Sequence, residues 1–323
     1  MERILVTGAT TPLGRRLIGR LQQEAQVENV IGIEPRATTE WMDGVELVGF
    51  EPDDHELVRF LADQGIDTVI HAGMTPTRSG LLTGAGDVPG LADVIGTMRL
   101  CAAIGHPSVQ VRSLLLVSSS EVYPVDPNAP LLHREGEATE AREIEPAASH
   151  LEAEDYARDV AVRLGHLDVG ILRLAELAGP GVGGPLASVL LQPVVPTPIG
   201  YDPAVQFLHI DDAADAIAFA ARLELAGFYN VASDGVLRWS EATGLRGRPA
   251  LPVLPFDAGP ATPLLRRLGI PHFPPGTGPT LRYGSAIDGA KLRSAGWKAR
   301  HDQRSCVRAL GRPRGQHEPT TDR

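Results

Sequence analysis

The chain has little lysine, little cysteine and no long apolar run. Lys291 and Lys298 are its two lysines among 30 basic residues, so arginine supplies nearly all of the positive charge. Cys101 and Cys306 are its two cysteines, which excludes a disulfide framework and fits a reducing compartment. No uninterrupted apolar stretch approaches the roughly 20 residues that span a bilayer, and no charged-then-apolar leader is present. We therefore expect a cytoplasmic protein without a membrane partner.

The chain also has fewer basic than acidic residues. The 30 basic and 40 acidic residues give a formal net charge of −10. Nucleic acids and anionic membranes bind basic surfaces, so this balance argues against both as partners. The 323 residues are nevertheless enough to bury a large core. We expect a small-molecule substrate, and we predict no metal site.

What the sequence does contain is a glycine turn close to its N-terminus. An apolar run over 4–6 predicts a strand, and a helical spacing of apolar residues begins near Pro12. Strand, glycine turn and helix N-terminus together bring backbone N–H groups to a pyrophosphate. Thr11 stands where such a turn commonly has its middle glycine. The residues predicted to contact the cofactor here are Gly8, Thr10, Thr11, Pro12, Leu13 and Gly14.

An acidic residue ends the second predicted strand, which covers 30–33. Glu34 lies twenty residues beyond Gly14, where an acid can bind the adenosine ribose hydroxyls. This spacing favours NAD over NADP. Arg36 can instead meet a 2′-phosphate, and the alternative for Glu34 is a solvated acid at a strand end.

Small residues end a third strand predicted over 67–71. His71, Ala72 and Gly73 would let a cofactor lie across the edge of the sheet, as would Val117 at the end of the strand over 111–117. The alternative for His71 is a histidine packed at the strand end.

Strands and helices alternate along the first part of the chain, which predicts parallel pairing with right-handed crossovers. We expect an α/β fold, a Rossmann-type doubly wound parallel sheet with a smaller C-terminal substrate lobe. The dinucleotide-binding domain would cover 1–178, with a strand and a helix from about 205–235, and the lobe would cover mostly 179–311. Residues 312–323 predict a disordered tail. Further strands are expected over 45–48, 169–173 and 227–231, and helices over 56–62, 91–104, 147–164, 213–221 and 289–295.

Other stretches predict loops and caps. We expect loops over 74–90 and 124–146, a looser pattern over 181–206, and a loose segment of the small lobe over 243–282. Asp53 and Asp54 precede one helix, and Asp211 or Asp212 would cap another.

In this order, the motifs resemble the extended short-chain dehydrogenase/reductase superfamily, and within it the NAD-dependent epimerase/dehydratase group. The resemblance covers about 2–310 and implies NAD or NADP along the strand ends, a substrate between the two lobes, and a homodimer. The matching segments are Thr7–Gly14, Glu34, Val69–Gly73, Ser118–Tyr123, Leu172–Arg173, Gly179–Pro180, Phe207–Asp212, Tyr229–Val231, Asp288–Leu292 and Gly296–Trp297.

The sequence departs from this group at its catalytic pair. The group uses a Tyr-x-x-x-Lys pair, in which the lysine lowers the pKa of the tyrosine, and no such pair exists in this chain. Depending on the register, its slot holds Ala147 and Leu151, or Pro146 and His150. Other departures are Asp93 in place of an asparagine, and Val205 and Gln206 where nucleotide-sugar members have an arginine.

Four polar residues near the expected site are candidates for catalysis. Ser119 or Ser120 retains the group's serine, and Glu121 lies where dehydratases keep an acid/base carboxylate. His150 has an ordinary pKa near 6.5 and can exchange protons at neutral pH. Tyr123 completes the set; its alternative is a packing residue, and that of His150 is a position on the surface of a helix.

Three functions follow from these observations. The chain is predicted to be an NAD(P)-binding oxidoreductase or epimerase/dehydratase-like enzyme that acts on a small metabolite with acid/base groups unlike those of the group. The alternatives are a catalytically inactive dinucleotide-binding module, and a non-redox enzyme on the same scaffold.

Overall fold

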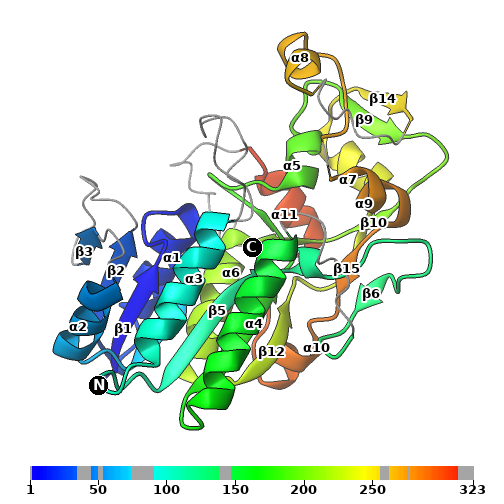
Figure 1. Cartoon of the computed structure of the whole chain (residues 1–323). Helices are drawn as coiled ribbons and strands as arrows, with labels where there is room; N and C mark the ends of the chain where they lie inside the picture. The colour runs from blue at the N-terminus through cyan, green and yellow to red at the C-terminus, as the bar shows by residue number, and fades with distance from the viewer. Residues whose placement is uncertain are drawn as a thin grey trace, which may run out of the picture.

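A seven-stranded parallel sheet forms the centre of the computed structural model, which describes residues 2–34, 45–49, 54–73, 91–137, 147–254, 262–274 and 276–311 (Figure 1). Each pairing within the sheet is parallel. In spatial order its strands are β12 (Gly227–Val231), β7 (Asp168–Leu174), β5 (Ser113–Ser119), β4 (Thr68–His71), β1 (Glu2–Thr7), β2 (Val27–Glu34) and β3 (Glu46–Gly49).

Helices cover both faces of this sheet, as in a doubly wound fold (Figure 1). One apolar core lies under α1 (Pro12–Leu21) and α6 (Ile210–Arg222). The core on the other face lies under α2 (Asp54–Gln64), α3 (Leu91–Ile104) and α4 (Ala147–Arg163). Every residue of β5 is buried, as expected for a strand covered on both sides. The predicted fold class is confirmed.

A third apolar core belongs to the smaller lobe, and it includes Phe207, Trp239 and Phe273. Two-stranded sheets join segments far apart in the chain, so that β6 pairs with β15 and β9 with β14. The elements outside the large sheet and its helices are η1 (Ser120–Val122), β6 (Leu132–His133), β8 (Glu176–Ala178), α5 (Pro185–Leu190), β9 (Val195–Pro198), β10 (Ala204–Val205), β11 (Phe207–His209), β13 (Leu237–Arg238), α7 (Trp239–Arg246), β14 (Ala250–Val253), α8 (Thr262–Arg267), α9 (Gly278–Tyr283), β15 (Ala286–Ile287), α10 (Ala290–Ser294) and α11 (Gln303–Ala309).

The predicted elements of the large sheet and its helices differ from the observed bounds by three residues or fewer. The prediction of a loose segment over 243–282 is wrong in part, because α7, β14, α8 and α9 lie in it. These elements are short, and frequent Pro and Gly hide their periodicity. The expectations for Asp53, for the side chains of Asp54 and Asp93, for 74–90, 138–146 and the tail 312–323 lie outside the described residues.

The predicted cap of α6 is also wrong. His209, not Asp211 or Asp212, is the N-cap, and its Nδ1 accepts the N–H of Asp211 at 3.2 Å. The two carboxylates have other partners: Asp211 accepts from Nε of Arg16 at 2.7 Å, and Asp212 faces Nδ1 of His301 at 3.1 Å. Because α6 begins at Ile210, Asp211 and Asp212 lie inside its first turn and not at the cap position.

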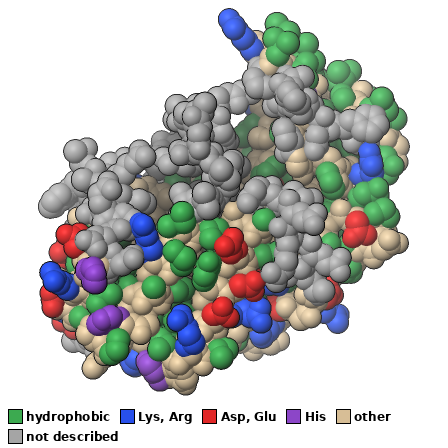
Figure 2. All heavy atoms as spheres, viewed as in Figure 1, with side chains coloured by type: hydrophobic (Ala, Val, Ile, Leu, Met, Phe, Trp, Pro, Cys, Tyr) green, Lys and Arg blue, Asp and Glu red, His purple; other side chains and the backbone are tan. Residues whose placement is uncertain are grey.

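Exposed apolar side chains gather at the far end of the small lobe. Leu251, Leu264 and Leu268 are exposed on or next to β14 and α8, and hydrophobic atoms cover this end in Figure 2. Among the described residues, no helix is long and apolar enough to cross a membrane.

Candidate functional site

The glycine turn brings three segments of backbone into close contact. Gly8 has a φ of 68°, and a Cβ there would lie 2.8 Å from the carbonyl oxygen of Ala72 and from Cα of Gly73. A Cβ on Gly14 would lie 2.1 Å from the carbonyl oxygen of Gly8. Both positions therefore require glycine, and the turn after β1 lies directly against the end of β4.

Thr11 closes the turn with its side chain. Its hydroxyl donates to the carbonyl of Gly8 at 2.7 Å and accepts the N–H of Gly14 at 3.0 Å, which makes it the N-cap of α1. Pro12 has no N–H to offer. The N–H of Leu13 has no acceptor within the described residues, and it is the first-turn donor left for an anion.

Glu34 contacts the same turn from the end of β2. Its Oε1 accepts the N–H of Thr10 at 2.6 Å. The bond holds the carboxylate beside the turn, where a ribose of a dinucleotide would lie. The carboxylate is thus a partner of the turn, not only a solvated strand end. Arg36 lies outside the described residues.

His71 is a packed histidine. Its Nδ1 lies 2.7 Å from the Thr7 hydroxyl and its Nε2 2.8 Å from that of Thr97. Burial lowers the pKa of His71 to about 4, so the ring is neutral at pH 7. Gly73 donates its N–H to Thr7 at 3.1 Å, which ties the ends of β1 and β4 together. The ring of His71 therefore holds the sheet edge in shape.

A buried polar network lies behind the end of β5. Arg173 binds Glu154 of α4 with two nitrogens, at 3.0 and 2.6 Å, and Ser118 donates to the same carboxylate at 2.7 Å. Tyr123 accepts from Arg173 at 3.0 Å and donates to Asn230 at 2.8 Å. Its ring also stacks on that of His133. The hydroxyl of Tyr123 thus uses its hydrogen bonds to hold the network together, and it is not part of the proposed chemistry.

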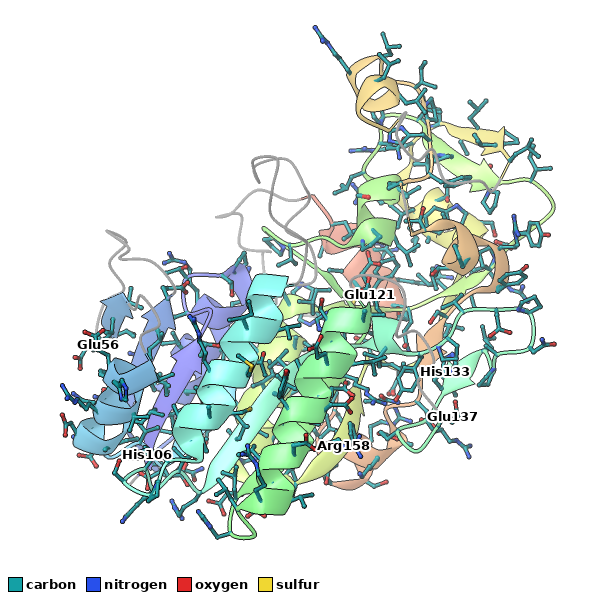
Figure 3. The ribbon with its side chains drawn as sticks, in the orientation of Figure 1. Glu56, His106, Glu121, His133, Glu137 and Arg158 are labelled. Atoms are coloured by element: carbon teal, nitrogen blue, oxygen red, sulfur yellow. The ribbon has the colours of Figure 1, made fainter. Side chains whose placement is uncertain are left out.

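Ser119 and Glu121 lie at the point where β5 passes into η1. The Ser119 hydroxyl accepts the N–H of Glu121 at 3.2 Å and lies 3.5 Å from its Oε2. Burial raises the pKa of Glu121, and the bond from Ser119 only partly opposes this shift. Figure 3 shows Glu121 at the N-terminal end of α4, and α4 packs against η1. A buried carboxyl group with a raised pKa can act as an acid or a base.

His150 is buried in the first turn of α4 without a partner. It is 3% exposed, and within the described part of the chain neither ring nitrogen has a hydrogen-bond partner. Burial lowers the pKa of His150 to about 4. The alternative that His150 is a surface position is therefore wrong. Buried polar atoms in proteins nearly always have partners, so an imidazole without one indicates a place for a ligand or water.

Glu176 was missing from the sequence candidates. It follows β7, and its two oxygens accept the N–H groups of Leu186 at 3.2 Å and Ala187 at 2.7 Å, at the start of α5. A Cβ on Gly184 would overlap the Glu176 side chain at 2.6 Å. Burial raises the pKa of Glu176 to about 8, against the backbone bonds, and the nearby Glu121 raises it further. The signal available in the sequence was an acid directly after a predicted apolar strand.

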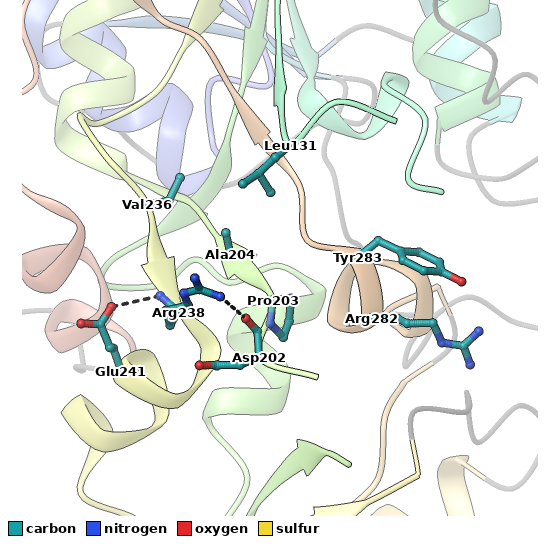
Figure 4. A pocket seen from close by; sticks show the side chains of 9 residues that line it. All are labelled: Leu131, Asp202, Pro203, Ala204, Val236, Arg238, Glu241, Arg282 and Tyr283. Atoms are coloured by element: carbon teal, nitrogen blue, oxygen red, sulfur yellow. Dashed lines mark hydrogen bonds between the residues drawn. The ribbon is translucent and has the colours of Figure 1, made fainter. Parts of the chain in front are cut away.

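A cavity of about 480 Å³ lies elsewhere, in the small lobe (Figure 4). Its carboxylates are engaged at the start of α7: Asp202 accepts from Ser240, and Glu241 from the N–H of Arg238. It includes none of the predicted site residues, and therefore does not define the candidate site. The lining residues are Leu131, Asp202, Pro203, Ala204, Val236, Arg238, Glu241, Arg282 and Tyr283.

Residues 4–232 match the model of the NAD dependent epimerase/dehydratase family. The chain belongs to this family. An uncharacterized protein of Mycobacterium tuberculosis is 32% identical over 298 residues, which are 90% of this chain and 78% of that protein.

Solved structures of the same architecture agree with the fold. UDP-N-acetylglucosamine 4-epimerase from Bacillus cereus superposes with a TM-score of 0.68 at 18% identity, over 96% of this chain and 98% of that one. For dTDP-glucose 4,6-dehydratase from Bacillus anthracis, in complex with NAD, the TM-score is 0.68 at 16% identity, over 96% and 95%.

Two residues stand where nucleotide-sugar members are expected to have an arginine, and both are buried. Val205 is part of the small-lobe core. Gln206 exchanges two hydrogen bonds with the backbone of Ile287, at 2.9 and 3.2 Å. Both side chains pack the lobe, and neither supplies a positive charge.

Proposed function

We propose that this chain is an NAD-dependent oxidoreductase of the epimerase/dehydratase type that acts on a small metabolite and moves protons with groups of its own. The observation that carries the proposal is the joint placement of the glycine turn and Glu34. Gly8 permits close backbone approach, and Glu34 is bonded to the same turn at Thr10. A cytoplasmic location and a homodimer remain predictions.

The residues of the turn fit an adenine dinucleotide. Leu13 would offer its N–H to the pyrophosphate at the start of α1, and Glu34 would accept from the ribose hydroxyls. A carboxylate at this position repels a 2′-phosphate, which supports NAD over NADP. Ala72 and Gly73 pack closely against Gly8, so the end of β4 and the turn would border the cofactor together.

The nicotinamide, when bound, supplies a hydride acceptor or donor. This chain lacks the tyrosine–lysine pair, so another group must move the proton. Glu121 is the best placed, because burial raises its pKa and Ser119 orients it. Neutral His150 can accept one hydrogen bond and donate another, which suits a hydroxyl of the substrate or cofactor.

The substrate is proposed to be smaller or less anionic than a nucleotide sugar. A related fold has been solved with UDP-glucose and NAD, at 20% identity. In this chain Val205 and Gln206 are packed into the lobe at the position expected to bind a diphosphate. Neither Val205 nor Gln206 carries the positive charge of an arginine.

The test is a thermal-shift titration with NAD, NADH, NADP and NADPH. A ligand at 100 times its dissociation constant adds about 2.7 kcal/mol to the free energy of unfolding, so binding is measurable. We expect stabilisation by NAD, and a loss of most of it in Glu34→Ala with a smaller effect on NADP. Glu28→Ala, which removes an exposed acid from the same strand, is the matched control. Absence of a shift with all four dinucleotides would contradict the proposal.

A further inference from the structure

Glu121 and Glu176 lie at the same level beyond two neighbouring strands. Ser119 of β5 pairs with Leu174 of β7 in the parallel ladder. Each glutamate follows its paired residue by two positions, at the carboxyl edge of the sheet. Two carboxyl groups therefore meet at the edge where ligands of open α/β sheets bind.

The charged surroundings of this carboxyl pair are one-sided. Glu176 faces the N–H groups of Gly184, Leu186 and Ala187 at the start of α5. The charge of the neighbouring Glu121 raises the pKa of Glu176. Glu121 faces the Ser119 hydroxyl from β5. Among the described residues, neither carboxyl group forms an ion pair with a lysine, an arginine or a histidine.

His150 is the independent sign that a ligand belongs here. Glu154, one turn further along α4, bonds to Ser118 of β5, so residues 150 and 154 lie on the helix face that packs against β5 and η1. His150 is therefore placed one turn nearer the sheet edge than Ser118. Both of its nitrogens are buried and have no hydrogen-bond partner among the residues that the structure describes, and the ring is neutral at pH 7.

The proposed function, on which this inference rests, indicates which half of the crevice contains the carboxyl pair. A dinucleotide bound by a doubly wound sheet spans its two halves. With the adenosine at Glu34, beyond β2, the nicotinamide end belongs over β4, β5 and β7. Glu121, Glu176 and His150 all lie at that end.

We propose that Glu121 and Glu176 make this site selective for the oxidised form of the dinucleotide. The two redox forms share the same phosphates and differ in their rings, since the nicotinamide of NAD⁺ is cationic and that of NADH is neutral. A pair of carboxylates in a half-buried site attracts the cationic ring of NAD⁺. The neutral ring of NADH gains no such attraction to offset the cost of its burial. A neutral imidazole, unlike a lysine, does not oppose this preference.

The preference depends on pH in a defined direction. Burial raises the pKa of both acids, that of Glu176 to about 8, so Glu176 still holds its proton at neutral pH. Binding of the cationic ring favours their ionised forms and releases protons. The Kd of NAD⁺ is expected to fall as the pH rises from 6 to 8, while that of NADH stays nearly constant.

Isothermal titration of the full chain with NAD⁺ and with NADH tests the inference at pH 6, 7 and 8. In buffers of different ionisation enthalpy the same titrations count the protons released. We expect NAD⁺ to bind about tenfold more tightly than NADH at pH 8. The ratio is expected to approach one in Glu121→Gln and Glu176→Gln, and to stay unchanged in the control Glu152→Gln on the exposed face of α4.

Tighter binding of NADH, or a ratio that neither glutamine variant changes, would overturn the inference and leave the proposed function intact. Failure of both redox forms to bind would instead overturn the proposed function, and this inference with it. If a glutamine variant does not fold, the wild-type protein decides: a ratio that is independent of pH, with no proton release, contradicts the inference.

Discussion

At the scale of single residues, Thr11 combines two roles that conflict. Its hydroxyl caps α1 and so stabilises the free protein, but it also occupies the N–H of Gly14. A bound pyrophosphate would compete for donors at this same helix end. The Thr11 hydroxyl therefore stabilises the free protein and leaves the turn one N–H fewer to offer an anion.

Thr11→Gly should shift that balance. Replacing a threonine cap by glycine costs only a few tenths of a kcal/mol of stability, and it frees the N–H of Gly14 for a phosphate. We expect a slightly lower urea midpoint and a lower Kd for NAD, measured by titration. An unchanged or higher Kd would show that this N–H does not face the cofactor.

His150→Leu removes a buried imidazole without partners. An unpaired polar group costs about 1–3 kcal/mol to bury, so the ligand-free variant should have a higher free energy of unfolding at pH 7, measured in urea. Stabilisation by NAD should decrease in the same variant. If stability falls, the ring must have a partner in solution, such as a bound water.

At the scale of elements, one buried ion pair joins α4 to β7 within a contact that is otherwise apolar. Arg173 and Glu154 are 3% and 2% exposed, and two hydrogen bonds join the guanidinium to the carboxylate. Removing one partner of such a pair leaves a charge buried alone.

We expect Glu154→Leu to lower the free energy of unfolding by about 3–5 kcal/mol, measured by urea denaturation. The double variant Glu154→Leu/Arg173→Met should lose much less, because no uncompensated charge remains. The control Glu152→Leu, on the exposed face of α4, should have little effect. Equal losses in the single and double variants would contradict this reasoning.

The elements that could be predicted from the sequence are those with a strong local pattern. Leu91–Ile104 and Gly227–Val231 were expected with the observed bounds, because continuous or periodic apolar residues mark them. The pairing of β6 with β15 could not be expected, since it joins residues 132–133 to 286–287 through two-residue strands. The same holds for α5, which is six residues long and begins among glycines.

The candidate site divides in the same way. The glycine turn and Glu34 follow from spacing alone. Glu176 does not follow from spacing. Its importance comes from the pairing of β5 with β7, which places it beside Glu121, and from the hydrogen bonds that it accepts from the α5 backbone. Spacing also could not show that Thr11 bonds to Gly14, or that the Tyr123 hydroxyl both donates and accepts a hydrogen bond.

At the scale of the whole molecule, buried titratable groups set two opposite trends of stability with pH. The pKa of His150 is lowered to about 4 from 6.5, so the unfolded chain binds more protons between these values and stability falls on acidification there. The pKa of Glu176 is raised from 4.5 to about 8, so the unfolded chain releases its proton first and stability falls as the pH rises through that range.

Two variants should separate these trends in urea unfolding measured from pH 5 to pH 8. Between pH 7 and pH 5, His150→Leu should lose about 2 kcal/mol less stability than the wild-type protein. Between pH 5 and pH 8, Glu176→Gln should lose less than the wild-type protein. Parallel curves for all three proteins would show that neither group titrates as its burial implies.

Both lobes depend on the last helix of the described chain. The side chain of Gln303, in α11, bonds to the backbone N–H and carbonyl of Phe207 and to the carbonyl of Ser233, at 2.8, 3.0 and 3.1 Å. Some 70 to 100 residues are synthesised between these backbone groups and Gln303, so the groups lack this partner until Gln303 leaves the ribosome. Premature termination before Gln303 would leave them uncovered, and truncated chains should be recognised and degraded even though every strand of the large sheet is already present.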